Sequence, residues 1–362
     1  MLNRLNRTYQ EDLDKVLQTI DLSPLRGKTV LVTGASGLIG SCFVDLLIRY
    51  NALYSTESIK KNEIPLKINI VVCGRSAGKL GKVFNCYFPY VYGPNFIEYD
   101  LTSGVPDINV DYIVHCAAPT QPKEFKDNPS NVIFSILNST KNILELAEEK
   151  KSTVIYLSSC EVYGNVQKGA VSEDDCGDID LASYRSSYIE AKRTAEVLCH
   201  CYADSEKHVD VRILRMGKVF GPTFSDVDNR VAAQFFRAVT TDMDGIVLRT
   251  RGKQTYTFTY VINAVYAMLL TLLDGMSRDV YNVASYDSTM SVFDFGQEVS
   301  NLVGKQVAIE ESPVDLGYSK NSCVLDGWRI WKELGYTEVV DTRTGIRNTF
   351  EALNGRYISN PS

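Results

Sequence analysis

The sequence lacks a long apolar run, a CxxC pair and any excess of positive charge. A helix that spans a bilayer needs about 20 consecutive apolar residues, so we expect no membrane segment. The net charge of −6 gives no reason to expect nucleic acid or an anionic membrane surface as a partner. The first ten residues also lack the apolar core of a secretory signal. These absences together predict a cytoplasmic protein.

Cysteine is present, but not in a pattern that holds a metal. The nine cysteines are scattered, and the close pair Cys199 and Cys201 flanks His200 within a stretch of helical periodicity. A zinc site needs further ligands at regular spacing, and the sequence offers no second cluster. We therefore expect reduced, partly buried thiols and no metal site.

Strand-like and helix-like segments alternate through the first 200 residues. Short apolar, β-branched runs fall at residues 29–33, 68–73, 96–101, 111–118 and 153–157. Segments with helical periodicity lie between them, for example at residues 41–50 and 131–150. This alternation predicts an α/β fold of the Rossmann type, with a doubly wound parallel sheet. A further amphipathic helix is expected in residues 1–25, before the first strand.

The first strand runs directly into three glycines at three-residue spacing, Gly34, Gly37 and Gly40. Gly34 would permit a sharp exit from the strand, Gly37 would let a phosphate approach the backbone, and Gly40 would allow close helix packing. The free N–H groups of the following helix would then face a pyrophosphate. A plain tight turn is the alternative, but the strand and helix context favours a dinucleotide site.

The end of the second strand bears on which dinucleotide binds. Enzymes that use NAD usually place Asp or Glu here, to accept from the ribose hydroxyl. This chain instead has Arg75 and Ser76, which suit a 2′-phosphate, with Lys79 and Lys82 nearby. We predict NADP as the cofactor, with NAD as the alternative; a solvated basic turn would also explain these residues.

A tyrosine and a lysine follow the fifth strand at helical spacing. Tyr188 and Lys192 lie at i and i+4 on one helical face. A lysine cation one turn from a phenol favours the phenolate and is expected to lower its pKa. A general base that removes a proton from a sugar hydroxyl needs such a pKa.

Three motifs together resemble the extended short-chain dehydrogenase/reductases, and within them the nucleotide-sugar epimerases, dehydratases and decarboxylases. They are Gly34-x-x-Gly37-x-x-Gly40, Ser158-Ser159-x-Glu161-Val162-Tyr163-Gly164 and Tyr188-x-x-x-Lys192. Segments 215–222, 258–261 and 280–284 are also similar to family elements. The resemblance implies a cofactor domain at residues 26–217 and a smaller mixed α/β substrate lobe at residues 218–362. Residues 255–285 or so would return to the cofactor domain.

The resemblance also implies a role for each matching residue. Tyr188 would be the base for the sugar hydroxyl, Lys192 would hold the nicotinamide ribose, and Ser159 would hydrogen-bond the reacting oxygen. Asp100 would accept from the adenine amine, beside Leu101. The pyrophosphate would lie against the glycine turn, at Gly34, Ser36, Gly37, Leu38, Ile39 and Gly40. The small residues Ala117 and Ala118 at the end of the fourth strand would let the nicotinamide pass close to the backbone. Family members commonly dimerise through the Tyr188 helix and the helix at 131–150, and they commonly serve polysaccharide synthesis.

The motifs depart from the 4,6-dehydratases at one position. Those enzymes carry Asp and Glu as the acid and base of an elimination, whereas this chain has Cys160 before Glu161. A thiol is a weak hydrogen-bond donor and a poor substitute for a carboxyl group. Glu161 could abstract a proton from carbon, orient the sugar or serve the structure alone. A 4-epimerase or decarboxylase acting through a 4-keto intermediate is therefore favoured over a dehydratase. A keto-sugar reductase, or a non-catalytic NADP-binding scaffold or sensor, is the alternative.

The expected substrate contacts depart from the family as well. Lys218 replaces the usual Asn, Tyr256 replaces the usual Arg, and Arg249 falls where an aromatic residue often stacks on the base. We expect Lys218 to supply the cation that Tyr256 cannot, and Arg249 to stack through its guanidinium. Solvated surface charges are the alternative. Thr120 and Cys160 complete the predicted substrate contacts, while Trp328 and Trp331 are expected in the core.

Overall fold

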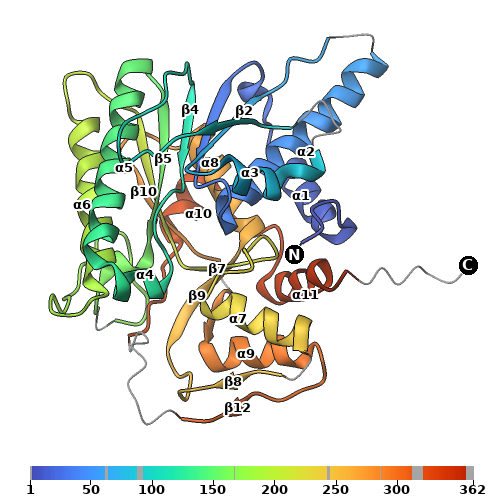
Figure 1. Cartoon of the computed structure of the whole chain (residues 1–362), viewed down its shortest axis with the longest axis vertical. Helices are drawn as coiled ribbons and strands as arrows, with labels where there is room; N and C mark the ends of the chain where they lie inside the picture. Colours follow the sequence, from blue (N-terminus) through green and yellow to red (C-terminus); the bar gives the residue numbers. More distant parts are fainter. Residues whose placement is uncertain are drawn as a thin grey trace, which may run out of the picture.

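The computed structural model describes residues 2–61, 64–87, 93–166, 168–242, 245–285, 287–311 and 321–355. It confirms the predicted architecture, since a seven-stranded parallel sheet lies between two layers of helices (Figure 1). In spatial order the strands are β10 (Val280–Val283), β6 (Val211–Met216), β5 (Thr153–Ser159), β4 (Tyr112–His115), β1 (Thr29–Thr33), β2 (Asn69–Gly74) and β3 (Asn95–Glu98).

Alternate residues of the central strands face the two helical layers. In β1, Val30 and Val32 join one hydrophobic cluster and Leu31 joins the other, and all three are fully buried. Successive side chains of a strand point to opposite faces, so a strand covered on both sides must be apolar throughout. The continuous apolar runs of the sequence therefore form the buried strands.

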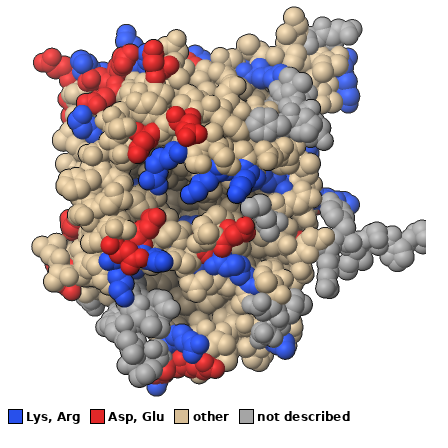
Figure 2. Space-filling model, viewed as in Figure 1, with Lys and Arg blue, Asp and Glu red and all other residues tan. Residues whose placement is uncertain are grey.

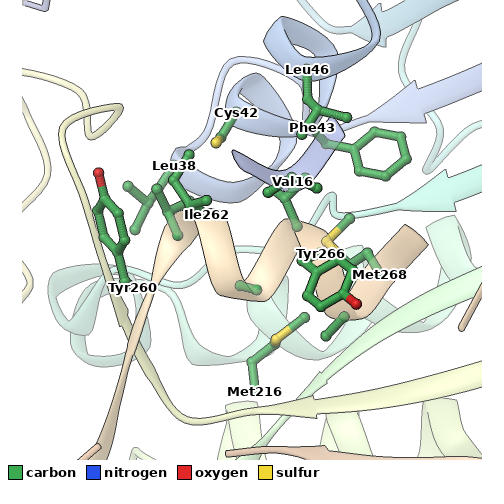
Figure 3. Packing of buried hydrophobic residues seen from close by; sticks show 14 of the residues in the cluster. Val16, Leu38, Cys42, Phe43, Leu46, Met216, Tyr260, Ile262, Tyr266 and Met268 are labelled. Carbon is green, nitrogen blue, oxygen red and sulfur yellow. The ribbon is translucent and has the colours of Figure 1, made fainter. Parts of the chain in front are cut away.

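One face of the sheet is covered by α1 (Arg7–Thr19), α2 (Leu38–Lys60) and α8 (Val261–Asp274), with α3 (Ala77–Phe84) at the edge. Figure 3 shows Val16 of α1 beside Phe43 and Leu46 of α2, above Ile262 and Met268 of α8. The other face is covered by α4 (Pro122–Asp127), α5 (Pro129–Lys150) and α6 (Ser186–Ala203).

A smaller lobe is formed by the later part of the chain, at the bottom of Figure 1. A three-stranded sheet contains β7 (Lys218–Phe220), β9 (Thr255–Tyr260) and β11 (Thr289–Ser291), and β8 (Val247–Leu248) pairs with β12 (Ala308–Ile309). The helices of this lobe are α7 (Val231–Arg237), the π-helix Ala238–Asp242, α9 (Val292–Asn301) and α11 (Thr342–Asn354). After β9 the chain returns to the large sheet, because α8 packs on this sheet and β10 joins its edge.

Two expectations differ from the structure. Trp328 and Trp331 are not in the core, since they are 59% and 49% exposed on α10 (Trp328–Leu334). This short helix buries Ile330 instead, and the two indole rings pack on each other with centroids 4.8 Å apart. The third strand ends at Glu98, so Asp100 and Leu101 lie in the loop after it. Among the described residues, no helix is both long and apolar enough to cross a bilayer.

Candidate active site

The glycine turn connects β1 to α2 and needs glycine at two positions for steric reasons. Gly34 has φ +64°, and a Cβ there would lie 2.7 Å from the backbone nitrogen of Ala117. A Cβ on Gly40 would lie 2.6 Å from the Gly34 carbonyl oxygen. Gly37 is the residue before the helix, and no side chain caps the helix there. Ser36 lies in the turn, and Leu38 and Ile39 begin α2. The first N–H groups of a helix have no partner within it, so this end of α2 could hold a pyrophosphate.

The expected adenosine end of the site lies at the ends of β2 and β3. Arg75 is exposed after β2, and the Ser76 hydroxyl caps α3 by accepting from the Lys79 nitrogen at 3.3 Å. Glu98 of β3 accepts from the Ala77 nitrogen at 2.9 Å, so a carboxylate stands beside this turn after all. The sequence could not show this, because Glu98 belongs to the neighbouring strand.

Asp100 is part of a local turn at this end of the site. Its Oδ1 accepts from the backbone nitrogen and the hydroxyl of Thr102, at 3.0 and 2.9 Å. These hydrogen bonds, with the nearby charge of Arg75, lower the pKa of Asp100. The carboxylate is therefore ionised and available as an acceptor, while Leu101 next to it is buried.

The segment after β4 passes close to the glycine turn. The Thr33 hydroxyl at the end of β1 accepts from the Ala117 nitrogen at 3.2 Å, which ties the two strand ends together. Ala117, Ala118 and Thr120 are all half-buried in this segment, which leads into α4.

Ser159, Tyr188 and Lys192 converge at the end of β5. Ser159 is close enough to Tyr188 to favour its phenolate, and the Ser159 hydroxyl accepts from the Glu161 nitrogen at 3.2 Å. The Tyr188 ring stacks on Phe125 with centroids 4.8 Å apart. The Lys192 Nζ donates to the Leu157 carbonyl at 2.7 Å and lies 4.6 Å from the centre of the Tyr156 ring.

The electrostatics of Tyr188 differ from the expectation. Burial, followed by the negative charge of Glu161, raises the pKa of Tyr188, whereas the helical spacing to Lys192 predicted a lowered value. The reason is that the Lys192 ammonium is directed at a backbone carbonyl. Burial lowers the pKa of Lys192 itself to about 8.

Glu161 is held between two cations. Its Oε2 accepts from the Arg185 guanidinium at 2.7 Å, and its Oε1 accepts from the Lys218 ammonium at 3.0 Å. Burial by itself would raise the pKa of Glu161, but Lys218 and Arg185 outweigh it and lower the pKa to about 2. A carboxylate with both oxygens engaged and so low a pKa is a poor base for a carbon acid. The geometry favours the role of orienting other groups.

The remaining predicted substrate residues divide into two places. Tyr256 lies by Glu161, because the Lys218 ammonium is 4.9 Å from the centre of its ring. Cys160 is buried at the start of the 3₁₀ turn that carries Glu161. Arg249 instead follows β8 at the outer end of the smaller lobe, where it forms an exposed ion pair with Glu310 at 2.7 Å.

Two charged residues of this site were missed in the sequence. Arg185 is the residue immediately before α6 and precedes Tyr188 by three positions. Glu196 follows Lys192 by four, on the same face of α6. Glu196 pairs with Arg215 at 2.7 Å and accepts from the Ser158 hydroxyl. The helical spacing was the available signal, but it does not tell which side chains find a partner.

Comparison with known proteins identifies the family of this chain. A model of the NAD dependent epimerase/dehydratase family matches residues 30–284. UDP-glucuronic acid decarboxylase 6 of Arabidopsis thaliana is 28% identical, and the match covers 81% of this chain and 82% of the relative. UDP-glucuronic acid decarboxylase 5 of the same plant is also 28% identical, and the match covers 90% of this chain and 91% of the relative. The structure of UDP-glucuronic acid 4-epimerase from Bacillus cereus, with UDP-glucuronic acid and NAD, has a TM-score of 0.72 and 22% identity, covering 90% of this chain and 98% of the other. The resemblance drawn from the motifs is confirmed: the chain belongs to the NAD-dependent epimerase/dehydratase family of nucleotide-sugar enzymes.

Proposed function

We propose that the protein decarboxylates a nucleotide-linked hexuronic acid through a 4-keto intermediate. The observation that carries this proposal is the ionised Glu161 between Arg185 and Lys218. An elimination would need a proton-abstracting carboxylate and an acid beside it. Glu161 is a poor base, and Cys160 stands where the acid would be. Decarboxylation of a β-keto acid needs neither, because the carboxyl group leaves with its bonding electrons left behind.

The charge of this cluster favours an acidic sugar. Two cations and one carboxylate leave one net positive charge in a largely buried position next to Ser159 and Tyr188. A buried charge without a partner is costly, so the site is suited to a substrate that brings a carboxylate. Relatives named as acting on UDP-glucuronic acid support this substrate class.

The residues at the end of β5 can handle the proton transfers. A nicotinamide bound next to the glycine turn supplies a hydride acceptor. Tyr188 acts as its phenolate, which burial disfavours in the substrate-free protein, and takes the proton of the C4 hydroxyl as the hydride leaves that carbon. Ser159 holds the developing ketone by a hydrogen bond. When carbon dioxide leaves, the negative charge moves to the C4 oxygen, where the same two hydroxyls stabilise it. A proton from solvent then takes the place of the carboxyl group on the sugar. When a hydride returns to C4 and Tyr188 gives its proton back to the C4 oxygen, the net change in the sugar is the loss of carbon dioxide.

A panel of UDP-, CDP-, dTDP- and GDP-sugars, followed by mass spectrometry, tests this proposal. We expect a hexuronic acid conjugate to lose the mass of carbon dioxide, and Tyr188→Phe to slow this at least about a hundredfold. A product of unchanged mass with inverted C4 would identify a 4-epimerase instead. If neither product forms and Tyr188→Phe has no effect in cells, the protein is a scaffold or sensor.

We propose NADP as the cofactor, supported by the exposed Arg75 at the end of β2. We expect NADP to bind more tightly than NAD, and Arg75→Ala to remove about tenfold of that preference, the value of one charge-assisted hydrogen bond. Glu98→Gln is the matched variant, because its carboxylate lies at the same turn and would repel a 2′-phosphate. Tighter binding of NAD by the unaltered protein would overturn the proposal and assign the ribose contact to Glu98.

We also propose a homodimer that forms through α5 and α6, which pack together along one side of the sheet (Figure 1). Phe134 on α5 and Val197 on α6 are 62% and 58% exposed, as expected of residues that a partner would cover. Sedimentation should give twice the mass of one chain, and Phe134→Glu should give monomers.

The smaller lobe would hold the nucleotide, with Thr120 and Arg249 as further proposed contacts.

A further inference from the structure

Two free thiols lie together next to the Glu161 cluster. Cys160 is 2% exposed, and the Sγ of Cys323 lies 3.5 Å from the Cys160 carbonyl oxygen. Cys323 also packs against the small buried cluster that contains Cys160. Both are free cysteines, and the proton transfers described above use neither of them.

Each cysteine is held in place by its backbone. Cys160 follows the last residue of β5 and begins the 3₁₀ turn. The Cys323 nitrogen donates to the Thr255 carbonyl at 2.9 Å, and its carbonyl accepts from Thr257 at 3.3 Å, so it is attached to β9. A disulfide requires two such positions that already bring the sulfurs together.

The surroundings distinguish this pair from the other buried cysteines. The neighbouring Cys323 thiol and the nearby Lys218 ammonium lower the pKa of Cys160 against the effect of burial. For Cys42 and Cys199, burial raises the pKa. The thiolate is the reactive form of cysteine, so Cys160 is the buried thiol best suited to attack an oxidant. Cys323 is partly exposed and adjoins it.

We propose that peroxide oxidises Cys160 and Cys323 to a reversible disulfide, and that this disulfide inactivates the active site. The Cys160 thiolate attacks hydrogen peroxide, giving a sulfenic acid and hydroxide. The Cys323 thiol then attacks that sulfur, a disulfide forms, and the hydroxyl group leaves as water. Two thiols are oxidised, and one peroxide is reduced to two water molecules. A dithiol reductant restores both thiols.

The bond would act on the residues that flank Cys160. Ser159 is on one side of it and Glu161 on the other, while Cys323 pairs with Tyr256. Drawing the 3₁₀ turn towards β9 moves Glu161 relative to Lys218 and Arg185, which disturbs the cluster that we propose for the substrate carboxylate. The loss of turnover rests on the proposed function, whereas the bond itself does not.

The experiment treats the whole protein with hydrogen peroxide and maps disulfides by peptide mass spectrometry, before and after dithiothreitol. We expect a peptide that joins Cys160 to Cys323, lost again on reduction, and a parallel reversible loss of at least about tenfold in turnover. Cys323→Ser should keep the turnover of the reduced protein and lose the response. Cys176→Ser, which removes an exposed cysteine, should respond like the unaltered protein.

The mapping separates the two proposals, because it needs no substrate. If the joined peptide is absent, or if it forms while turnover is unchanged, the switch is overturned. If the fully reduced protein turns over no sugar nucleotide, the proposed function fails, whatever the peptide map shows.

Discussion

The ammonium of Lys218 lies 3.0 Å from the carboxylate of Glu161 and 4.9 Å from the centre of the Tyr256 ring. The family resemblance places Asn and Arg at positions 218 and 256, and this chain has Lys and Tyr. The positive charge is therefore on β7 in this chain and not on the neighbouring β9, but it still lies beside Glu161 and Tyr256. Lys218 does not stand alone as a phosphate contact, because Glu161 already engages it.

Replacing Lys218 by methionine should change both substrate affinity and pH dependence. With less positive charge beside it, the pKa of Glu161 rises from about 2, so the acid limb of kcat/KM moves to higher pH. We expect KM for the nucleotide sugar to rise about tenfold, as for one lost charge-assisted contact. Lys141→Met, which removes an exposed ion pair with Glu145, is the control. An unchanged KM and an unchanged acid limb would contradict this role.

Lys192→Met should stabilise the fold while abolishing activity. In the unaltered folded protein the pKa of Lys192 is about 8, below its ordinary value of 10.5. Between these two values the unfolded chain binds more protons than the folded one, so the free energy of unfolding rises with pH. Below pH 8 the buried ammonium costs up to about 3 kcal/mol, of which the hydrogen bond to Leu157 returns about 1 kcal/mol. Urea unfolding at pH 7 should show a variant more stable by about 2 kcal/mol, with the difference shrinking towards pH 10. Lower stability of the variant at pH 7 would refute the argument.

Gly34→Ala should weaken both the fold and the binding of nicotinamide dinucleotide. The left-handed backbone is strained for alanine, and the added Cβ would meet the Ala117 backbone at 2.7 Å. We expect a loss of about 1–3 kcal/mol in the free energy of unfolding and a higher dissociation constant. Gly169→Ala is the matched control, since nothing lies within 4 Å of a Cβ there. Equal behaviour of the two variants would show that the turn tolerates a side chain.

Glu196→Gln should destabilise the protein because it leaves the Arg215 guanidinium without its buried carboxylate. The two side chains are only 7% and 14% exposed, and breaking such a pair from one side costs about 3–5 kcal/mol. Thermal and urea unfolding measure the change. Glu145→Gln, in an exposed pair, should cost less than about 1 kcal/mol. Similar costs at the two positions would mean that Arg215 finds another partner.

The sequence by itself determined the order of the strands and helices, the glycine turn and the face of α6 that carries Tyr188 and Lys192. These follow from local spacing, because a strand repeats every two residues and a helix about every 3.6. The sequence also indicated the family, since each motif lies within one short continuous stretch of the chain. Spacing could not place Trp328 and Trp331, whose exposure depends on which face of a short helix meets the sheet.

The electrostatic state of the site was decided only by the tertiary structure. Arg185 reaches Glu161 from the start of α6, where it is the residue before the helix, and Lys218 reaches it from β7. Their charges, not the neighbours of Glu161 in the chain, lower its pKa. In the same way, burial and the charge of Glu161 raise the pKa of Tyr188, although Lys192 lies one helical turn away. A pKa depends on distances through space and on loss of water, and both arise only when distant segments pack together.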